Sequence, residues 1–167
     1  ITFADEVTIG GTKLPAGTYG LFTIPGRSEW TFVLNKGAKL WGAYEYKQAE
    51  DVLRVKATPS AAPFTERLTF TFANVETESA DVVLAWEKLQ VSFAIKVNAV
   101  EKTVANARQA VAGAKADDWM TPLRAASFCI ENNVNLDEAN AWLDKALLAN
   151  EHYYVVLGKA RLYKAKG

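Results

Sequence analysis

The chain has few residues of the types that carry out acid–base or nucleophilic chemistry. Its only histidine is His152 and its only cysteine is Cys129. A histidine catalyses as a general base when a nucleophile or a second acid is paired with it, and no such motif surrounds His152. The sequence also lacks a nucleophile elbow, a zinc-binding helix motif and an acidic calcium loop. We therefore expect no catalytic residue, metal or cofactor, and we expect His152 to be a partly exposed residue at a helix end.

Carboxylates could act without histidine, and adjacent acids occur at residues 5–6, 50–51 and 117–118. Neighbours on a strand point to opposite faces, and acids at a turn are usually solvated, so these pairs argue against a two-acid hydrolase. Cys129 stands between apolar residues of a predicted helix and is expected to be a buried small side chain.

Aromatic residues are the remaining candidates for a functional surface. Trp41, Tyr44 and Tyr46 lie in "WGAYEYKQAED", a connection between two predicted strands that ends at Asp51. Exposed tryptophan and tyrosine stack on sugars or anchor a protein partner, and connections often carry binding residues. We take these four as candidate ligand-binding residues for a small molecule, a glycan or a protein.

A role in the core is the alternative for these aromatics, and the strand pattern favours it. Trp30 and Trp86 fall in register with apolar neighbours on their own strands. A carbohydrate role is favoured instead if Trp41 and Tyr44 have coplanar, exposed rings beside an acid.

The bulk composition excludes several classes of protein. The 19 basic and 19 acidic residues of this 167-residue chain cancel and are scattered, which argues against a nucleic-acid surface. No apolar run has the length of a transmembrane segment, and the first residues do not resemble a signal peptide. Because the chain begins within an apparent strand, we expect an unpaired sheet edge, which a homo-oligomer would cover.

The first part of the chain, residues 1–97, alternates apolar and polar side chains. This period of two, with short spacers, predicts an antiparallel β-sandwich. About eight strands are expected, at residues 2–9, 12–14, 18–24, 30–35, 52–58, 66–75, 80–87 and 89–97. The stretch "LPAGTYGLFTIPG" could suggest a phosphate-binding loop, but its glycines flank strands and no helix follows, so we interpret them as turns.

The second part, residues 98–167, has a helical period and is rich in alanine, so the whole chain is expected to be α+β. Four helices are predicted, at residues 99–113, 119–132, 137–149 and 153–166. Leu123 and Leu157, and likewise Ala126 and Ala160, are 34 residues apart. This period resembles the tetratricopeptide helix pair. A protein-interaction scaffold is a second alternative, favoured if a concave face of the helices carries exposed Asn106, Asn140 or Arg108 and does not pack on the sheet.

Three segments together resemble one protein family. They are "KLPAGTYGLFTIPGRSEWTFVLNK", "WGAYEY" followed by "EDVLRVKATP", and "LAWEKLQVSFAIKV". On these segments, residues 1–97 are identified as resembling DUF2911, an uncharacterised bacterial family. The resemblance implies export to the periplasm or cell envelope and an upstream segment rich in glycine and aromatics. It supplies no catalytic residues, so the sequence predicts a non-catalytic binding or envelope-associated module.

Overall fold

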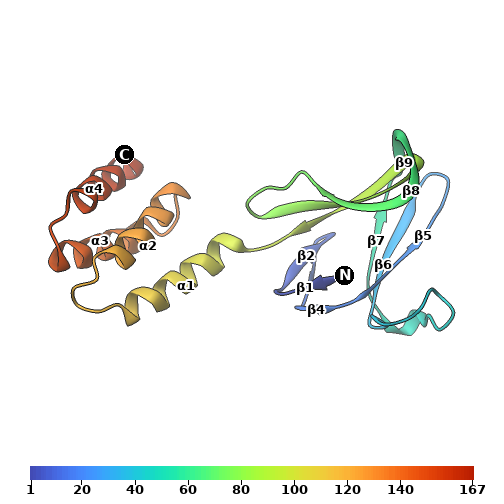
Figure 1. Cartoon of the computed structure of the whole chain (residues 1–167), viewed down its shortest axis with the longest axis horizontal. Coiled ribbons are helices and arrows are strands. Elements are labelled where there is room, and N and C mark those ends of the chain that lie inside the picture. The colour runs from blue at the N-terminus through green and yellow to red at the C-terminus, as the bar shows by residue number, and fades with distance from the viewer. The chain divides into compact units, whose positions relative to one another are not determined.

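The computed structural model describes residues 1–167 and divides them into two compact units, Ile1–Asn98 and Ala99–Gly167 (Figure 1). The first unit is built from strands and one short 3-10 helix, and the second is built from helices alone. The chain is therefore α+β, as the change from a strand period to a helix period predicts.

Nine strands form the first unit, and every strand pair is antiparallel. Their bounds are β1 Thr2–Phe3, β2 Val7–Ile9, β3 Thr12–Leu14, β4 Gly17–Thr18, β5 Gly20–Ile24, β6 Trp30–Asn35, β7 Asp51–Ala57, β8 Ser60–Ala73 and β9 Ser79–Lys96. They make a four-stranded sheet in the order β3-β2-β9-β8, a three-stranded sheet in the order β5-β6-β7, and the pair β1-β4.

The core of this unit lies between the two larger sheets. Phe32 and Leu34 from β6 pack in one buried cluster with Leu84 and Phe93 from β9. The rings of Phe32 and Phe93 meet with their centroids 4.8 Å apart. Apolar side chains from both inner faces thus fill one interior, which confirms the predicted sandwich.

One long strand replaces two of the predicted strands. The ranges 80–87 and 89–97 belong together in β9, which continues through Glu87 although that residue has a φ of +55°. The register against β8 shifts on both sides of the pair Thr65–Glu87. Buried residues are even-numbered before this bulge, as at Leu84, and odd-numbered after it, as at Val91. The bulge therefore resets the alternation that suggested two separate strands.

Other strand boundaries differ in smaller ways. The range 2–9 contains β1 and β2, separated by a bend, and the range 18–24 contains the end of β4 and all of β5. β8 begins at Ser60, earlier than predicted, because the Ser60–Gln90 and Ala61–Leu89 pairs extend its ladder with β9. The turn interpretation holds for Gly26, which lies between β5 and β6, but Gly17 and Gly20 are the first residues of β4 and β5.

Four helices form the second unit, as predicted. They are α1 Ala99–Gly113, α2 Met120–Glu131, α3 Leu136–Ala149 and α4 Tyr153–Lys166. Buried alanines allow close packing, since Ala126 on α2 and Ala139 and Ala146 on α3 are fully inaccessible. Pro122 falls in the first turn of α2, where its missing N–H costs no helical hydrogen bond. None of the helices has the length and apolar character needed to cross a membrane.

Candidate functional site

Residues 36–50 form a long loop that joins β6 to β7, and the buried side chain of Asn35 fastens its base. The Asn35 amide nitrogen donates to the Lys47 carbonyl at 3.0 Å and to Asp51 Oδ1 at 2.8 Å. The Asn35 amide oxygen accepts from the Gly37 N–H at 2.7 Å. One side chain therefore binds both ends of the loop and has its polar atoms satisfied, as a buried amide requires.

A second set of hydrogen bonds surrounds the other oxygen of Asp51. Tyr46 Oη donates to Asp51 Oδ2 at 2.7 Å, and Arg54 Nε donates to the same oxygen at 2.8 Å. Arg54 Nη2 also donates to Tyr46 Oη at 2.9 Å. These donors, with Asn35, form a connected polar network at the loop base.

The network sets the protonation of its members. Burial raises the pKa of Asp51, but hydrogen bonds from Asn35, Tyr46 and Arg54 outweigh burial and hold that pKa below its usual value. Burial and the hydrogen bond to Asp51 raise the pKa of Tyr46. Asp51 is thus a stable anion and Tyr46 a neutral phenol, so neither is prepared for proton transfer near neutral pH.

The structure places the four candidate residues in two groups. Tyr46 and Asp51 lie in the loop base, where their polar atoms bind protein partners, and the Tyr46 ring packs on Phe22 with centroids 5.2 Å apart. Trp41 and Tyr44 lie in the turn region of the loop and are each 84% exposed. The sequence pattern does not distinguish these groups, because all four residues fall within one connection.

Trp41 and Tyr44 form a pair of exposed, parallel rings. The angle between the two ring planes is 4°, and the ring centroids are 5.9 Å apart. A tight turn brings them together, with Gly42 at a φ of +65° and the Tyr46 N–H donating to the Ala43 carbonyl. The two rings line an open hollow with Gly42 and Ala43. The expected core role is therefore wrong for Trp41 and Tyr44.

The strand tryptophans divide in the same way. Trp30 is partly buried against the sandwich core, which agrees with its register. Trp86 is about half exposed, although it stands in register with the buried Leu84 and precedes the bulge residue Glu87. Register alone therefore predicts the side of the sheet but not whether the opposite sheet covers that position.

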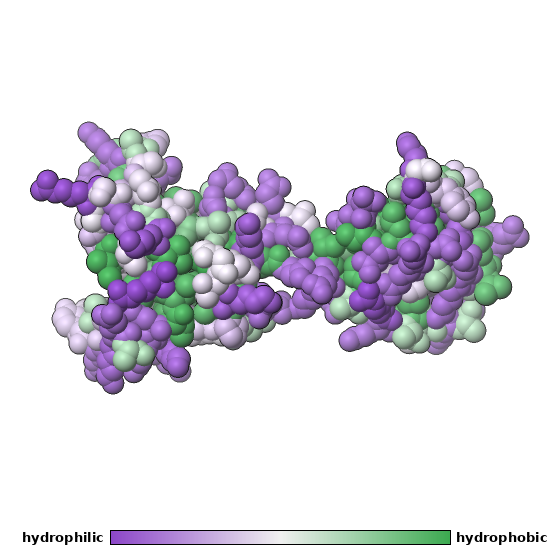
Figure 2. Space-filling view, turned by 180° about the vertical axis from the view of Figure 1, so that it is seen from behind, coloured by the Kyte–Doolittle hydropathy of each residue, from purple (hydrophilic) through white to green (hydrophobic).

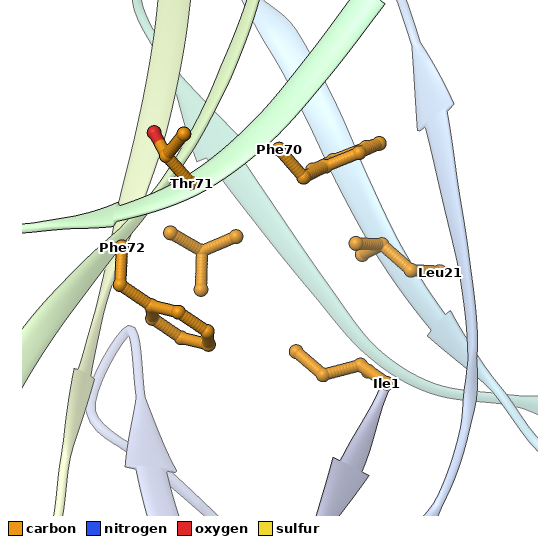
Figure 3. A pocket seen from close by; sticks show the side chains of 6 residues that line it. Ile1, Leu21, Phe70, Thr71 and Phe72 are labelled. Atoms are coloured by element: carbon orange, nitrogen blue, oxygen red, sulfur yellow. The ribbon is translucent and has the colours of Figure 1, made fainter.

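An apolar hollow at the edge of the sandwich was missed by the sequence analysis. Phe70 and Phe72 pair with Leu84 and Val82 and so face the interior side of the sheet, yet both are about half exposed or more. β8 is an edge strand, so the opposite sheet does not reach them. Figure 3 shows their side chains with those of Leu21 and Ile1 around this hollow. Its volume is about 300 Å³. The lining has no acid or base, so this hollow suits apolar groups and offers no general acid or base.

The remaining reactive side chains are used within the helical unit. His152 Nδ1 accepts from the Tyr154 N–H at 3.3 Å and caps α4, and its ring stacks between Trp119 and Tyr154 with centroids 4.3 and 5.4 Å away. Its expected place at a helix end is confirmed. Cys129 is fully buried, and burial raises the pKa of its thiol. No three side chains of histidine, cysteine, aspartate or glutamate gather as metal ligands.

Comparison with known proteins agrees with the family that the sequence suggested. No curated protein and no solved structure matches the chain. The family model described as "Protein of unknown function (DUF2911)" matches residues 1–95, more than half of the 167 residues and nearly all of the β-sandwich. The chain therefore belongs to the DUF2911 family.

Proposed function

We propose that the β-sandwich is a non-catalytic binding module of the bacterial cell envelope, and that Trp41 and Tyr44 are its ligand contacts. The observation that carries this proposal is the pair of parallel rings, 84% exposed, on a loop whose base is held by hydrogen bonds. Large aromatic side chains are expensive to leave in water, and these two contribute little to the core. A binding role explains why these two rings are exposed to solvent.

The loop base prepares this surface in advance. Asn35, Tyr46, Asp51 and Arg54 hold the two ends of the loop through charge-assisted and buried hydrogen bonds. A loop that is already ordered loses less conformational entropy when a ligand binds. In this account Tyr46 and Asp51, which we also selected as candidate ligand residues, act as positioning residues for the two exposed rings.

A glycan is the ligand class that fits the rings best. An aromatic ring has a negative face, and a pyranose with equatorial substituents presents a flat face of polarised C–H groups to it. Glu45 is exposed next to Tyr44 and supplies a carboxylate that can accept hydrogen bonds from sugar hydroxyls. The two rings are stacked and not coplanar, so a sugar would lie on one exposed ring face and not across both, with Glu45 as a polar neighbour in the sequence.

The envelope location rests on the family resemblance, and it suggests which glycan to test first. Peptidoglycan is the β-linked polysaccharide of the bacterial envelope, and chitin has a similar β-linked backbone of equatorial sugars. Co-sedimentation with purified peptidoglycan sacculi and with chitin tests both. We expect the protein to pellet with at least one of them, and the double variant Trp41→Ala/Tyr44→Ala to stay in the supernatant.

A matched control distinguishes binding by the ring pair from non-specific adsorption through any exposed aromatic side chain. Trp86→Ala removes another exposed tryptophan from the same unit, far from the loop in sequence, and is expected to pellet like the parent protein. Equal pelleting of the double variant and the parent would refute the proposed contact residues. No pelleting of the parent protein would refute both glycans as ligands.

Asn106 and Arg108 are exposed, as the scaffold alternative requires, but two of its three residues bind other side chains of the helical unit. Arg108 makes two hydrogen bonds to Glu138, at 2.7 and 2.8 Å, and Asn140 Oδ1 accepts from Lys159 at 2.8 Å. Of the residues proposed for partner contact, only Asn106 stays exposed without such a contact. We therefore do not assign a peptide-binding role to that set.

A further inference from the structure

Two free charges flank the ring pair along the chain. Lys39 precedes Trp41 by two residues, and Glu45 directly follows Tyr44. Both charged side chains are exposed, and neither forms an ion pair. Figure 2 shows hydrophilic residues, coloured purple, spread over the visible face of both units and not gathered in one patch. A charge preference at the rings therefore depends on the charged groups of their own loop.

The other cations of the loop are paired or stand farther from Trp41 in the sequence. Lys47 Nζ lies 3.8 Å from Glu50 Oε1, so these two charges partly neutralise each other. Lys36 is exposed, but it stands five residues before Trp41, and its N–H donates to the Glu50 carbonyl at the loop base. Lys39 is thus the free cation nearest to Trp41 along the chain.

The residue between Lys39 and Trp41 is turned away from solvent. The side chain of Leu40 lies against Gly37, where a Cβ would be only 2.6 Å from Leu40 Cδ1, and Leu40 is partly buried. Its two neighbours, Lys39 and Trp41, are both exposed. Because a lysine carries its charge on a flexible four-carbon stem, the Lys39 ammonium can reach an anionic group held on the Trp41 ring.

We propose that the sugar bound by this loop is acidic, and that it lies on Trp41 with its carboxylate beside the Lys39 ammonium. This inference rests on the binding role proposed above for the ring pair. Trp41 has the larger ring, and Tyr44 stacks on one side of it, which leaves the other face for the sugar. On Tyr44 the carboxylate of Glu45 would repel an acidic sugar. Lys39 is therefore the residue that selects the charged ligand.

Three related sugars isolate the effect of charge. N-acetylmuramic acid is N-acetylglucosamine with a lactyl ether on O3, and its methyl ester keeps the lactyl group but removes the charge. Each sugar is titrated into the ¹⁵N-labelled chain while the indole signal of Trp41 is followed. We expect the acid to bind roughly two- to fivefold more tightly than its ester at low salt, since exposed ion pairs contribute modestly. The preference should disappear at about 0.5 M salt, where exposed charges are screened.

Matched variants locate the recognised charge. Lys39→Gln removes the ammonium, and we expect this variant to bind the acid and the ester equally while its affinity for N-acetylglucosamine stays unchanged. Lys88→Gln makes the same change at an exposed position of β9 and is expected to keep the preference of the parent chain. Both lysines are exposed, so circular dichroism should show unchanged folding.

Two results would overturn this inference and leave the glycan role of the ring pair intact. One is equal affinity of the parent chain for the acid and the ester at low salt, with N-acetylglucosamine still shifting the Trp41 signal. The other is an unchanged preference in Lys39→Gln, which would place the recognised cation elsewhere. If none of the three sugars shifts the Trp41 signal, the proposed function itself fails, and the inference fails with it.

Discussion

The amide of Asn35 donates a hydrogen bond to the carboxylate of Asp51 across 2.8 Å, and this contact closes the base of the 36–50 loop. Asn35 is the last residue of β6 and Asp51 the first of β7, so the bond joins the ends of two neighbouring strands. The ladder between β6 and β7 shifts its register between Leu34 and Asn35. The loop that carries Trp41 and Tyr44 therefore begins at an irregular end of this strand pair, which the side chain of Asn35 holds by hydrogen bonds.

Replacing Asp51 by asparagine tests the importance of this base. The change keeps the shape of the side chain but removes the charge that Tyr46 and Arg54 donate to. We expect the free energy of unfolding to fall by about 1 kcal/mol, because Tyr46 and Arg54 are partly exposed and water replaces part of the lost hydrogen bonding. Urea denaturation measures this, and Glu66→Gln, an exposed acid of the same unit, is the control. Equal stability of the two variants would mean that the network does not hold the loop.

The stability that Asp51 contributes is expected to depend on pH with a definite sign. Its pKa in the folded protein is below the usual value, because hydrogen bonds from Asn35, Tyr46 and Arg54 outweigh the effect of burial. The contribution is therefore complete above the usual aspartate pKa of about 4 and is lost as the pH falls below it. The difference in unfolding free energy between the parent and Asp51→Asn should stay constant from pH 7 to 5 and shrink below pH 4. A difference that grows toward acid pH would contradict the assignment.

The two exposed rings should be dispensable for folding. Trp41 and Tyr44 are 84% exposed, so the double change to alanine removes little buried area. We expect a change in unfolding free energy within about 0.5 kcal/mol, as for other surface substitutions. Phe32→Ala in the same sandwich removes a fully buried ring and should cost about 3–5 kcal/mol. A large loss of stability in the double variant would place the rings in a structural role.

Gly20 supports the loop from the neighbouring strand β5. A Cβ at this position would lie 2.7 Å from the Gly37 carbonyl oxygen, which is backbone and cannot turn aside. Gly20→Ala is therefore expected to displace the start of the loop and to destabilise the sandwich by about 1–3 kcal/mol. Gly11→Ala is not a suitable control because of its positive φ. Ala16→Gly, a change at an exposed position nearby in the sequence, is the control. Urea denaturation curves of the Gly20→Ala and Ala16→Gly variants measure the difference in stability.

Cys129 reports on the packing of the helical unit. Its side chain is fully buried and burial raises the pKa of the thiol, so a thiol reagent should not reach a reactive thiolate in the folded protein. We expect one equivalent of 5,5′-dithiobis(2-nitrobenzoic acid) to react in denaturant and almost none under native conditions. Fast reaction of the native protein would show that the α2–α3 packing opens readily.

The helical unit was largely predictable because its signals are local. The helical period gave helix ends within about one residue of those observed, the boundary uncertainty that such signals carry. Asp137, for example, was expected near the start of a helix and lies in the first turn of α3. The repeat spacing was also visible in the sequence. What the spacing did not show is that Ala160 is bare where its counterpart Ala126 is buried.

The sandwich was predictable as a class but not at its irregular points. Glu87 in a left-handed conformation keeps β9 continuous, and only its pairing with Thr65 reveals the bulge. The exposure of Phe70 depends on the reach of the opposite sheet, which is a long-range property. The sequence identified the candidate residues of the loop. It could not show that Tyr46 is hydrogen-bonded at the loop base while Tyr44 is exposed, because that depends on the folded loop.

If Trp41 and Tyr44 bind a glycan, the indole N–H signals of the protein will report the contact. The chain has five tryptophans, so a ¹H–¹⁵N spectrum contains five indole signals, and Trp41→Phe assigns one of them. Addition of the β-linked tetramer of N-acetylglucosamine is expected to shift the Trp41 signal with saturation and to leave the buried Trp142 signal in place. A Trp41 signal that does not move at millimolar sugar, or that moves no more than the others, would contradict the account.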